Sequence, residues 1–306
     1  MDNYAAGIVL YNPKIDRLKE NIEAIIPQVK ILYCYNNGLG NAQRVMDLLK
    51  SYANIVVLGR GTNDGISKAL NCIVEQADKD NIQWLLTLDQ DSIVSDDMIQ
   101  SLATLTNIEN AGIICPQLKD IRRKNEQPVS PLDSYEDVDI CFTSGSFMNV
   151  KATKSIGGFD KYLFIDFVDH DICLRMKCEG YRVIRNNSVV LDHELGTLRA
   201  SRFEKIYLKL GALLHSETIK KLSYKRTVSP MRVYYSTRNM IYMKKKFSNY
   251  TTRKSWNTKL IKNIVSYLLR GEKKISILKS IAKGLKDGKN KQVEPYVASV
   301  AFKTAD

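Results

Sequence analysis

The stretch Trp84-Leu85-Leu86-Thr87-Leu88-Asp89-Gln90-Asp91 decides the fold of this chain. A strongly apolar run passes directly into two carboxylates, which indicates a buried strand that ends in a polar loop. Two earlier runs have the same form. Ala5–Tyr11 is apolar and stops at Asn12-Pro13, and Lys30–Tyr35 stops at Asn36-Asn37-Gly38.

Helical spacing separates these runs, since apolar residues recur at three- and four-residue intervals. Strands that alternate with such helices predict an α/β fold, with a mostly parallel sheet covered by helices on both faces. Ligands of such sheets bind beyond the carboxyl ends of the strands. The sequence therefore predicts a site at Asn12, Asn36-Asn37 and Asp89/Asp91. The expected helices are 17–26, 43–52, 66–78 and 167–179, and the other expected strands are 54–58, 111–116, 142–150 and 182–191.

Charge divides the chain into two regions. Residues 199–306 hold 26 Lys/Arg against 6 Asp/Glu, whereas the whole chain has a net charge of +13, so residues 1–198 are mildly acidic. We expect one domain over 1–199, which contains the predicted site, and a basic, mainly helical region over 200–306. A region with this charge favours an anionic partner such as lipid headgroups, a nucleic acid or a phosphorylated acceptor.

The composition narrows the class of protein. A 306-residue chain with 44% apolar residues can bury a substantial core, so wholesale disorder is excluded. There is no run of about 18 apolar residues and no basic-then-apolar start, which argues against a spanning helix and a secretory signal. Six scattered cysteines are best read as free thiols in a reducing cytoplasm.

Two pairs of carboxylates could carry chemistry. Asp89 and Asp91 offer the oxygen ligands that Mg²⁺ or Mn²⁺ prefers, although an Asp-x-Asp turn can also be a solvated loop or a helix cap. Asp169 and Asp171 lie at a predicted helix start, where one could accept a proton from a hydroxyl group. In the alternative interpretation they cap the helix and pair with Arg175. His193 could complete a metal site or be a structural histidine.

Taken in order, several short motifs resemble the family 2 glycosyltransferases of the GT-A fold, a Rossmann-like architecture, and in particular the bacterial rhamnosyltransferases. The resemblance covers about 1–200. The motifs that carry it are Ile8-Val9-Leu10-Tyr11-Asn12-Pro13, Asn63-Asp64-Gly65-(x5)-Asn71, Leu88-Asp89-Gln90-Asp91-Ser92, Thr143-Ser144-Gly145-Ser146, Gly157-Gly158-Phe159-Asp160, Phe164-Ile165-Asp166-(x2)-Asp169-(x)-Asp171-(x2)-Leu174-Arg175 and His193-(x2)-Gly196.

The resemblance implies a role for each matching residue. Asp91 and His193 would bind the metal, and Asp169 would be the catalytic base. An acceptor site would form around Ser144, Gly145, Asp171 and Arg175. The nucleotide-sugar donor would be bound by Tyr11, Asn12, Asn37, Asn63, Gly65, Asp89 and Asp91.

Two positions depart from the family pattern. Asn36 stands where the family often has Asp, and Val168 stands where the usual acid precedes the base. The first departure leaves the nucleotide open. The resemblance implies inverting, metal-dependent transfer of rhamnose from dTDP-rhamnose to a lipid-linked or cell-surface polysaccharide acceptor. UDP-galactofuranose, UDP-galactose or UDP-glucose is the alternative donor.

The basic region admits several interpretations. Lysine clusters mixed with apolar residues, as in Lys244-Lys245-Lys246-Phe247, suit helices that lie on an anionic leaflet. We therefore expect a cytoplasmic protein bound peripherally to the inner face of the cell membrane. A solvated basic face and a homo-oligomer contact are the alternatives. A nucleic-acid-binding protein is the rival class, but the carboxylates at the predicted strand ends would repel phosphates, so no nucleic-acid partner is expected.

Overall fold

The computed structural model describes residues 3–120, 134–193, 198–220, 223–226, 229–251 and 253–299. The chain forms two compact units. Unit 1 comprises Met1–Phe164, Val168–His193 and Ala298–Asp306, and unit 2 comprises Ile165–Phe167 and Glu194–Val297. The chain therefore passes from one unit to the other more than once.

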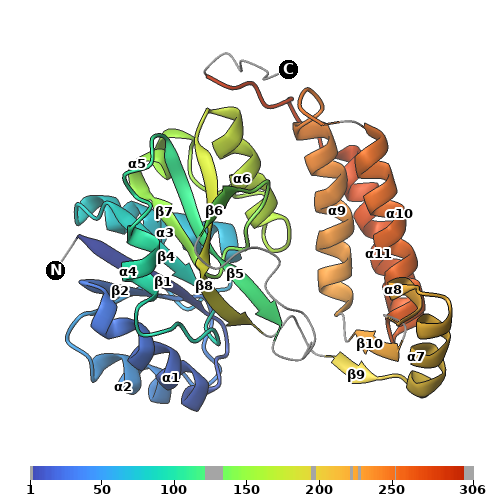
Figure 1. Ribbon diagram of the computed structural model, residues 1–306, viewed down its shortest axis with the longest axis horizontal. Helices are drawn as coiled ribbons and strands as arrows, with labels where there is room; N and C mark the ends of the chain where they lie inside the picture. Colours follow the sequence, from blue (N-terminus) through green and yellow to red (C-terminus); the bar gives the residue numbers. More distant parts are fainter. Residues whose placement is uncertain are drawn as a thin grey trace. The chain divides into compact units, whose positions relative to one another are not determined.

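Unit 1 is built on an eight-stranded sheet (Figure 1). Its first four strands in spatial order are mutually parallel, so their carboxyl ends meet at one edge. β7 (Ser146–Asn149) and β6 (Tyr135–Asp137) pair antiparallel with their neighbours, so the predicted parallel arrangement holds mainly in the N-terminal half. The spatial order is β3 (Ile55–Leu58), β2 (Ile31–Asn36), β1 (Tyr4–Leu10), β4 (Trp84–Leu88), β7 (Ser146–Asn149), β5 (Ala111–Asp120), β8 (Arg182–His193) and β6 (Tyr135–Asp137).

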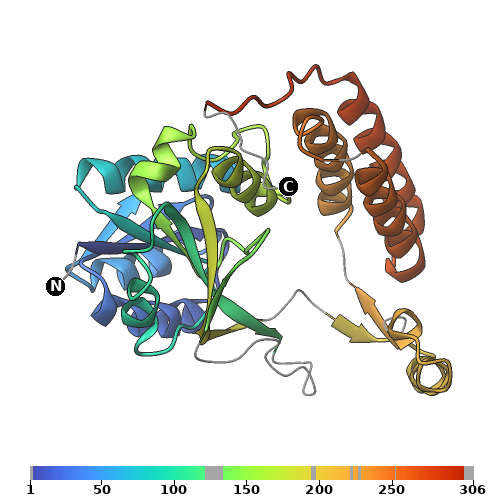
Figure 2. The same ribbon diagram turned by 45° about the horizontal axis from the view of Figure 1, so that its top comes forward.

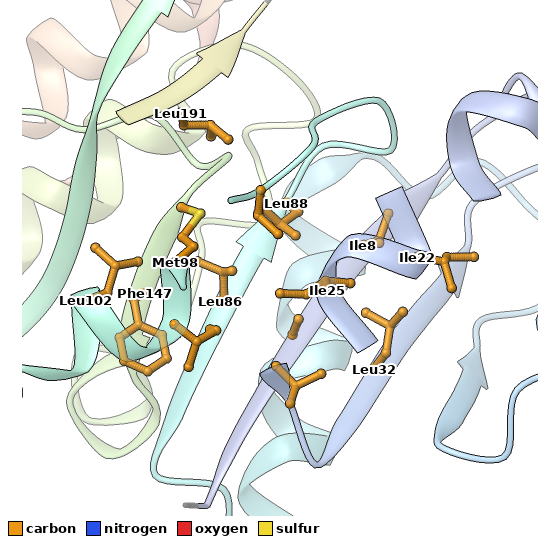
Figure 3. Close-up of a cluster of buried hydrophobic side chains, with 14 of the residues drawn as sticks. Ile8, Ile22, Ile25, Leu32, Leu86, Leu88, Met98, Leu102, Phe147 and Leu191 are labelled. Atoms are coloured by element: carbon orange, nitrogen blue, oxygen red, sulfur yellow. The ribbon is translucent and has the colours of Figure 1, made fainter. Parts of the chain in front are cut away.

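Helices cover both faces of the sheet, as the alternation of strands and helices predicted. One face packs against α1 (Ile15–Ile25), which continues as a short 3₁₀ turn (Ile26–Gln28), and against α2 (Ala42–Lys50) and α4 (Met98–Ala103). Figure 3 shows part of this core. Each fully buried Leu or Ile there contributes on the order of 1.5–3 kcal/mol relative to an exposed position.

The opposite face carries α3 (Ile66–Lys79), with α5 (Val150–Ser155) against it, and α6 (Val168–Cys178) against β8. A Cβ at Gly7 of β1 would come within 2.6 Å of Ile73 in α3. Only glycine therefore lets this helix approach the sheet so closely.

The strand predicted over 142–150 is wrong in its bounds. The observed strand is Ser146–Asn149, because Gly145 has φ +90° before it and Val150 begins α5 after it. The side chain of Asn149 caps that helix by accepting a hydrogen bond from the Ala152 amide at 3.0 Å.

Unit 2 is mainly helical, as predicted for the region past residue 200. Figure 2 shows its three long helices side by side: α9 (Pro230–Lys246), α10 (Arg253–Arg270) and α11 (Lys274–Asn290). They enclose a small core of Val233, Ile277 and Ile281. An antiparallel ribbon of β9 (Leu198–Ala200) and β10 (Tyr224–Arg226), with α7 (Glu204–Leu213) and α8 (Glu217–Lys220), completes the unit. Within the described residues, none of the helices has the length and apolar content needed to cross a membrane.

Candidate active site

The loop that follows β4 is held at several points of its backbone. The Asn21 side-chain nitrogen donates to the Asp89 carbonyl at 2.8 Å, and the Arg17 guanidinium donates to the Asp91 carbonyl at 2.9 Å. The Asp89 amide in turn donates to the Ser144 hydroxyl at 3.0 Å. Both aspartate side chains are exposed. The loop is thus fixed through its backbone while its carboxylates face outward.

Tyr11 and Asn12 lie beside this loop at the end of β1. The Gln90 side chain accepts from the Tyr11 amide at 2.8 Å and donates to the Tyr11 carbonyl at 3.1 Å. Asn12 adopts φ +46°, and its amide donates to the Gly38 carbonyl at 2.9 Å. The Tyr11 ring is half exposed, so it can stack on a planar ligand.

Asn37, Asn63 and Gly65 also come together, at the ends of β2 and the start of α3. The buried Asn37 side chain accepts from the Asp64 amide at 2.7 Å and donates to the Asn63 side chain at 3.2 Å. Asn63 also accepts from the Gly65 amide at 3.2 Å. This amide network closes the turn that begins α3.

Asp64 anchors the same turn. Hydrogen bonds from Lys68 at 2.6 Å and from the Tyr35 hydroxyl at 2.9 Å hold the pKa of Asp64 below its ordinary value. Burial, and then Asp64, raises the pKa of Tyr35 to about 12. The turn therefore carries a carboxylate that stays ionised at neutral pH.

The first half of α3 fixes the backbone that leads to α6. Asn71 accepts from the Phe159 amide and donates to the Phe159 carbonyl, both at 2.7 Å. The Ser67 hydroxyl donates to the Leu163 carbonyl at 2.6 Å, and the Ile66 amide donates to the Phe164 carbonyl at 2.7 Å. These contacts join the motif at 63–71 to the motif at 157–160 and to the residues that follow it.

Asp169 lies in the first turn of α6 with 19% of its side chain exposed. Its Oδ1 accepts from the His170 amide at 2.9 Å and lies 3.0 Å from His170 Nδ1. Among the described residues, no hydrogen bond reaches Oδ2. One oxygen is therefore oriented while the other can accept a proton.

Asp171 and Arg175 form a buried ion pair on the same helix. Arg175 contacts the fully buried Asp171 carboxylate through Nε at 2.8 Å and a terminal nitrogen at 2.6 Å, and it donates to the Ile156 carbonyl at 2.7 Å. The alternative interpretation, in which Asp171 pairs with Arg175, is what the structure shows. The pair can shape an acceptor site only by holding α6 in place.

Ser144 and Gly145 are buried as well and contact the end of β4. Ser144 bonds the Asp89 amide and lies 2.8 Å from the Ser92 hydroxyl, and the Gly145 amide donates to the Thr87 carbonyl at 2.8 Å. A Cβ at Gly145 would come within 2.9 Å of Leu191 and Pro116. Ser144 therefore holds the Asp89–Ser92 loop, and Gly145 holds the end of β4 that precedes it.

The carboxylate oxygens of the loop after β4 are ligands that suit a hard divalent cation. Mg²⁺ and Mn²⁺ are commonly held by one or two carboxylates together with substrate phosphates, and Asp89 and Asp91 are exposed carboxylates. Within the described residues no group of three or more His, Cys, Asp or Glu side chains could hold a metal. The side chain of His193 lies outside the described residues, as does Gly196, so its predicted role as a metal ligand stays a prediction.

Sequence reasoning missed Arg17, Asn21 and Gln90. Asn21 gave a readable signal, because it is a polar residue on the apolar face of α1, beside the buried Leu18 and Ile22. Gln90 was quoted only as the spacer between two aspartates, yet its side chain joins the ends of β1 and β4.

Residues 6–143 match the family model described as "Glycosyl transferase family 2". The chain is 26% identical to the "dTDP-rhamnosyl transferase RfbF" of Shigella flexneri over 210 residues, which cover 63% of this chain and 70% of that protein. These matches support a family 2, rhamnosyltransferase-like protein.

Solved glycosyltransferase structures share the fold. PcManGT, a mannosyltransferase from Pyrobaculum calidifontis in complex with GDP-Man and Mn²⁺, has a TM-score of 0.53 and 13% identity, covering 93% of this chain and 86% of that one. GalNAc-T7 with UDP, GalNAc and Mn²⁺ has a TM-score of 0.51 and 11% identity, covering 78% of this chain and 50% of that one. The chain thus spans half the length of that second structure, and the predicted GT-A fold is confirmed.

Proposed function

We propose that this glycosyltransferase, which is similar to family 2 over residues 6–143, transfers L-rhamnose from dTDP-rhamnose to a saccharide acceptor with inversion at the anomeric carbon. The observation that carries the proposal is the fixed Asp89–Ser92 loop at the carboxyl end of β4, with the half-exposed Tyr11 ring beside it. The similarity to a dTDP-rhamnosyl transferase supports the choice of donor.

The donor side consists of residues at three strand ends. Tyr11 and Asn12 would hold the base, Asn37, Asn63 and Gly65 would shape the ribose pocket, and Asp89 would face the ribose or the sugar. A divalent cation bound through Asp91 would neutralise the charge that develops on the departing diphosphate. His193 is kept in the proposal as a further ligand.

Asp169 is the proposed base. Its Oδ2 accepts the proton of the acceptor hydroxyl as that oxygen attacks the anomeric carbon. The new carbon–oxygen bond forms as the bond to the diphosphate oxygen breaks, and the electron pair leaves with the nucleoside diphosphate. His170 keeps the other carboxylate oxygen in place. A single displacement of this kind inverts the anomeric centre.

A panel of labelled nucleotide sugars tests the donor, with dTDP-rhamnose, UDP-galactofuranose, UDP-galactose and UDP-glucose offered to a lipid-linked acceptor with and without Mn²⁺. We expect transfer from dTDP-rhamnose only. Transfer from a UDP-sugar would keep the mechanism and replace the donor. Failure with every donor, together with no donor binding, would contradict the function.

Two substitutions test the residue roles. Asp169→Asn should lower kcat by about 10²–10⁴-fold with donor affinity within about twofold, because it removes only the base. Asp91→Asn should abolish metal-dependent donor binding. Asp139→Asn, on an exposed carboxylate in unit 1, is the matched control and should leave both quantities unchanged.

Unit 2 is the proposed membrane-binding part. Ile261, Val265 and Leu269 are exposed at four-residue intervals on α10, and Ile275 and Leu278 are exposed on α11. Residues 199–306 carry 26 basic against 6 acidic residues. Apolar side chains framed by lysines fit an anionic leaflet, which would place the enzyme beside a lipid-linked acceptor at the cytoplasmic face.

Co-sedimentation with vesicles tests this surface. The protein should bind phosphatidylcholine vesicles only when phosphatidylglycerol is included, and Ile261→Ser with Leu269→Ser should weaken binding. Met231→Ser, at another exposed apolar position of unit 2, is the matched control. Equal binding by both variants would contradict the assignment. Self-association in place of vesicle binding would favour the oligomer alternative, and binding to duplex DNA would favour the nucleic-acid alternative.

A further inference from the structure

A three-residue segment stands directly before the helix that carries Asp169. Ile165–Phe167 belongs to unit 2, although Phe164 before it and Val168 after it belong to unit 1. Asp166 and Phe167 adopt φ +64° and +67° in succession. Residues with side chains rarely adopt this conformation, so surrounding contacts must hold it.

Those contacts come from α9. The Asn239 side-chain nitrogen donates to the Ile165 carbonyl at 2.8 Å and to the Asp166 carbonyl at 2.9 Å. An Asn amide nitrogen has two hydrogens, so both are used on two successive carbonyls. Arg232, in the first turn of α9, also pairs with the Asp166 carboxylate.

The orientation of Asn239 is fixed in turn. Arg238 donates to the Asn239 side-chain oxygen through Nε at 2.9 Å and through a terminal nitrogen at 2.7 Å. Because a cation occupies the oxygen, the nitrogen must face the two carbonyls. Arg238 itself is buried, and its guanidinium lies 4.7 Å from the centre of the Tyr235 ring.

The glycines of α11 make room for this arrangement. A Cβ at Gly284 would come within 2.8 Å of the Tyr234 carbonyl, and one at Gly288 within 2.9 Å of the Arg238 carbonyl. α11 therefore lies directly against the backbone of α9 at the turn that carries Asn239.

The residue before the segment is held independently within unit 1. The Ile66 amide donates to the Phe164 carbonyl at 2.7 Å, and a Cβ at Gly65 would come within 2.5 Å of the Phe164 ring. The carbonyls of three successive residues, 164 to 166, thus each accept a hydrogen bond from a fixed donor.

We propose that Asn239 is a positioning residue for the base Asp169. By holding the carbonyls of Ile165 and Asp166, it sets the direction in which the chain enters α6, whose second residue is Asp169. The inference rests on the proposed function, because it assigns Asn239 a role through the base of that reaction. A small displacement of a catalytic group can cost about 10²-fold in rate.

Asn239→Asp is the test, because it keeps the Arg238 contact and the side-chain shape while it replaces the donating nitrogen by oxygen. We expect kcat to fall about 10–100-fold with the donor KM and donor Kd within about twofold. Asn257→Asp is the matched control, because the exposed Asn257 accepts from Lys244 at 2.7 Å and a carboxylate accepts equally well. A purely structural defect would instead lower the active fraction and leave the kcat of the folded fraction unchanged.

A second variant covers the case in which Asn239→Asp fails to fold. Arg232→Gln removes the ion pair of Asp166 at an exposed position and should lower kcat about 3–10-fold, again without a change in donor KM. If folded variants keep the wild-type kcat, or lose only donor affinity, the inference is wrong. Should Asp169→Asn retain wild-type kcat, the base assignment itself falls. If Asp169→Asn loses activity while the Asn239 and Arg232 variants keep full activity, the positioning role of Asn239 is wrong and the base assignment stands.

Discussion

In unit 1 the loops at the strand ends are held by amide and hydroxyl side chains that bond backbone groups, whereas in unit 2 the long helices approach one another through glycines. Asn21, Asn37 and Asn71 each bond a neighbouring loop in unit 1. Gly284 and Gly288 instead let α11 reach the backbone of α9 in unit 2. The strand-end loops of unit 1 should therefore be sensitive to the loss of polar partners, and the packing of α11 against α9 in unit 2 should be sensitive to added volume.

The largest effect is expected at the buried ion pair of unit 1. Arg175→Met leaves the fully buried Asp171 carboxylate without its cation, which should cost about 3–5 kcal/mol of unfolding free energy. Urea denaturation measures this loss of unfolding free energy, with the unfolding of unit 1 monitored by hydrogen exchange of its peptides. Arg182→Met, which breaks an exposed pair with Asp137, should cost less than about 1 kcal/mol. Equal losses of unfolding free energy in the two variants would mean that burial does not determine how much an ion pair contributes to stability.

A smaller loss is expected at Asn71. Asn71→Ala leaves the amide and the carbonyl of Phe159 unsatisfied in a buried position, so we expect about 3 kcal/mol, again by urea denaturation. Asn107→Ala, at an exposed turn, is the control. A loss below about 1 kcal/mol in Asn71→Ala would show that the loop can rearrange around the missing side chain.

Gly284→Ala tests the sensitivity of unit 2 to volume. Helix propensity alone would stabilise α11 by about 1 kcal/mol, whereas the contact of the new Cβ with α9 should destabilise it. We expect a net loss of about 1–2 kcal/mol, seen as faster hydrogen exchange in α9 and α11. A gain in stability would show that the two helices are not in close contact at this turn.

The smallest effect is expected on acidification. A hydrogen bond from Tyr33 at 2.6 Å, and then those from Gln76, hold the pKa of Asp80 below its ordinary value. The corresponding stability is present above the unfolded pKa of about 4 and disappears as the pH falls through the folded value. Asp80→Asn should therefore lose about 1 kcal/mol near neutral pH and match the wild type near pH 2. If the unfolding free energies of Asp80→Asn and the wild type differed by the same amount from neutral pH to pH 2, the ionisation of Asp80 would not contribute to stability.

The sequence was most informative where apolar runs meet polar residues. The strand Trp84–Leu88 has the predicted bounds, and α3 and α6 lie within about one residue of their predicted ends. Such elements are readable because local spacing determines them. Asn12, Asn37 and Asp89/Asp91 were predicted at one sheet edge because parallel strands bring their carboxyl ends together.

The residues that hold the site in place were harder to predict from the sequence. Gln90 bonds Tyr11, which is 79 residues away in sequence, and Asn239 bonds carbonyls 74 and 73 residues away. No local pattern marks such contacts, since they depend on which segments the fold places side by side. Asn21 was the exception, because a polar residue on an apolar helix face requires a partner.

The long sequence separation of the Asn239 contacts has a consequence for the order of events during synthesis. All eight strands of the sheet precede α9 in the chain, so the sheet can assemble while α9 is still inside the ribosome. The carbonyls of Ile165 and Asp166 cannot accept hydrogen bonds from Asn239 until α9 has left the ribosome. We therefore expect a ribosome-bound chain stalled before residue 230 to contain the folded sheet while its proposed base, Asp169, is not yet aligned, so that full activity appears only after α9 has emerged.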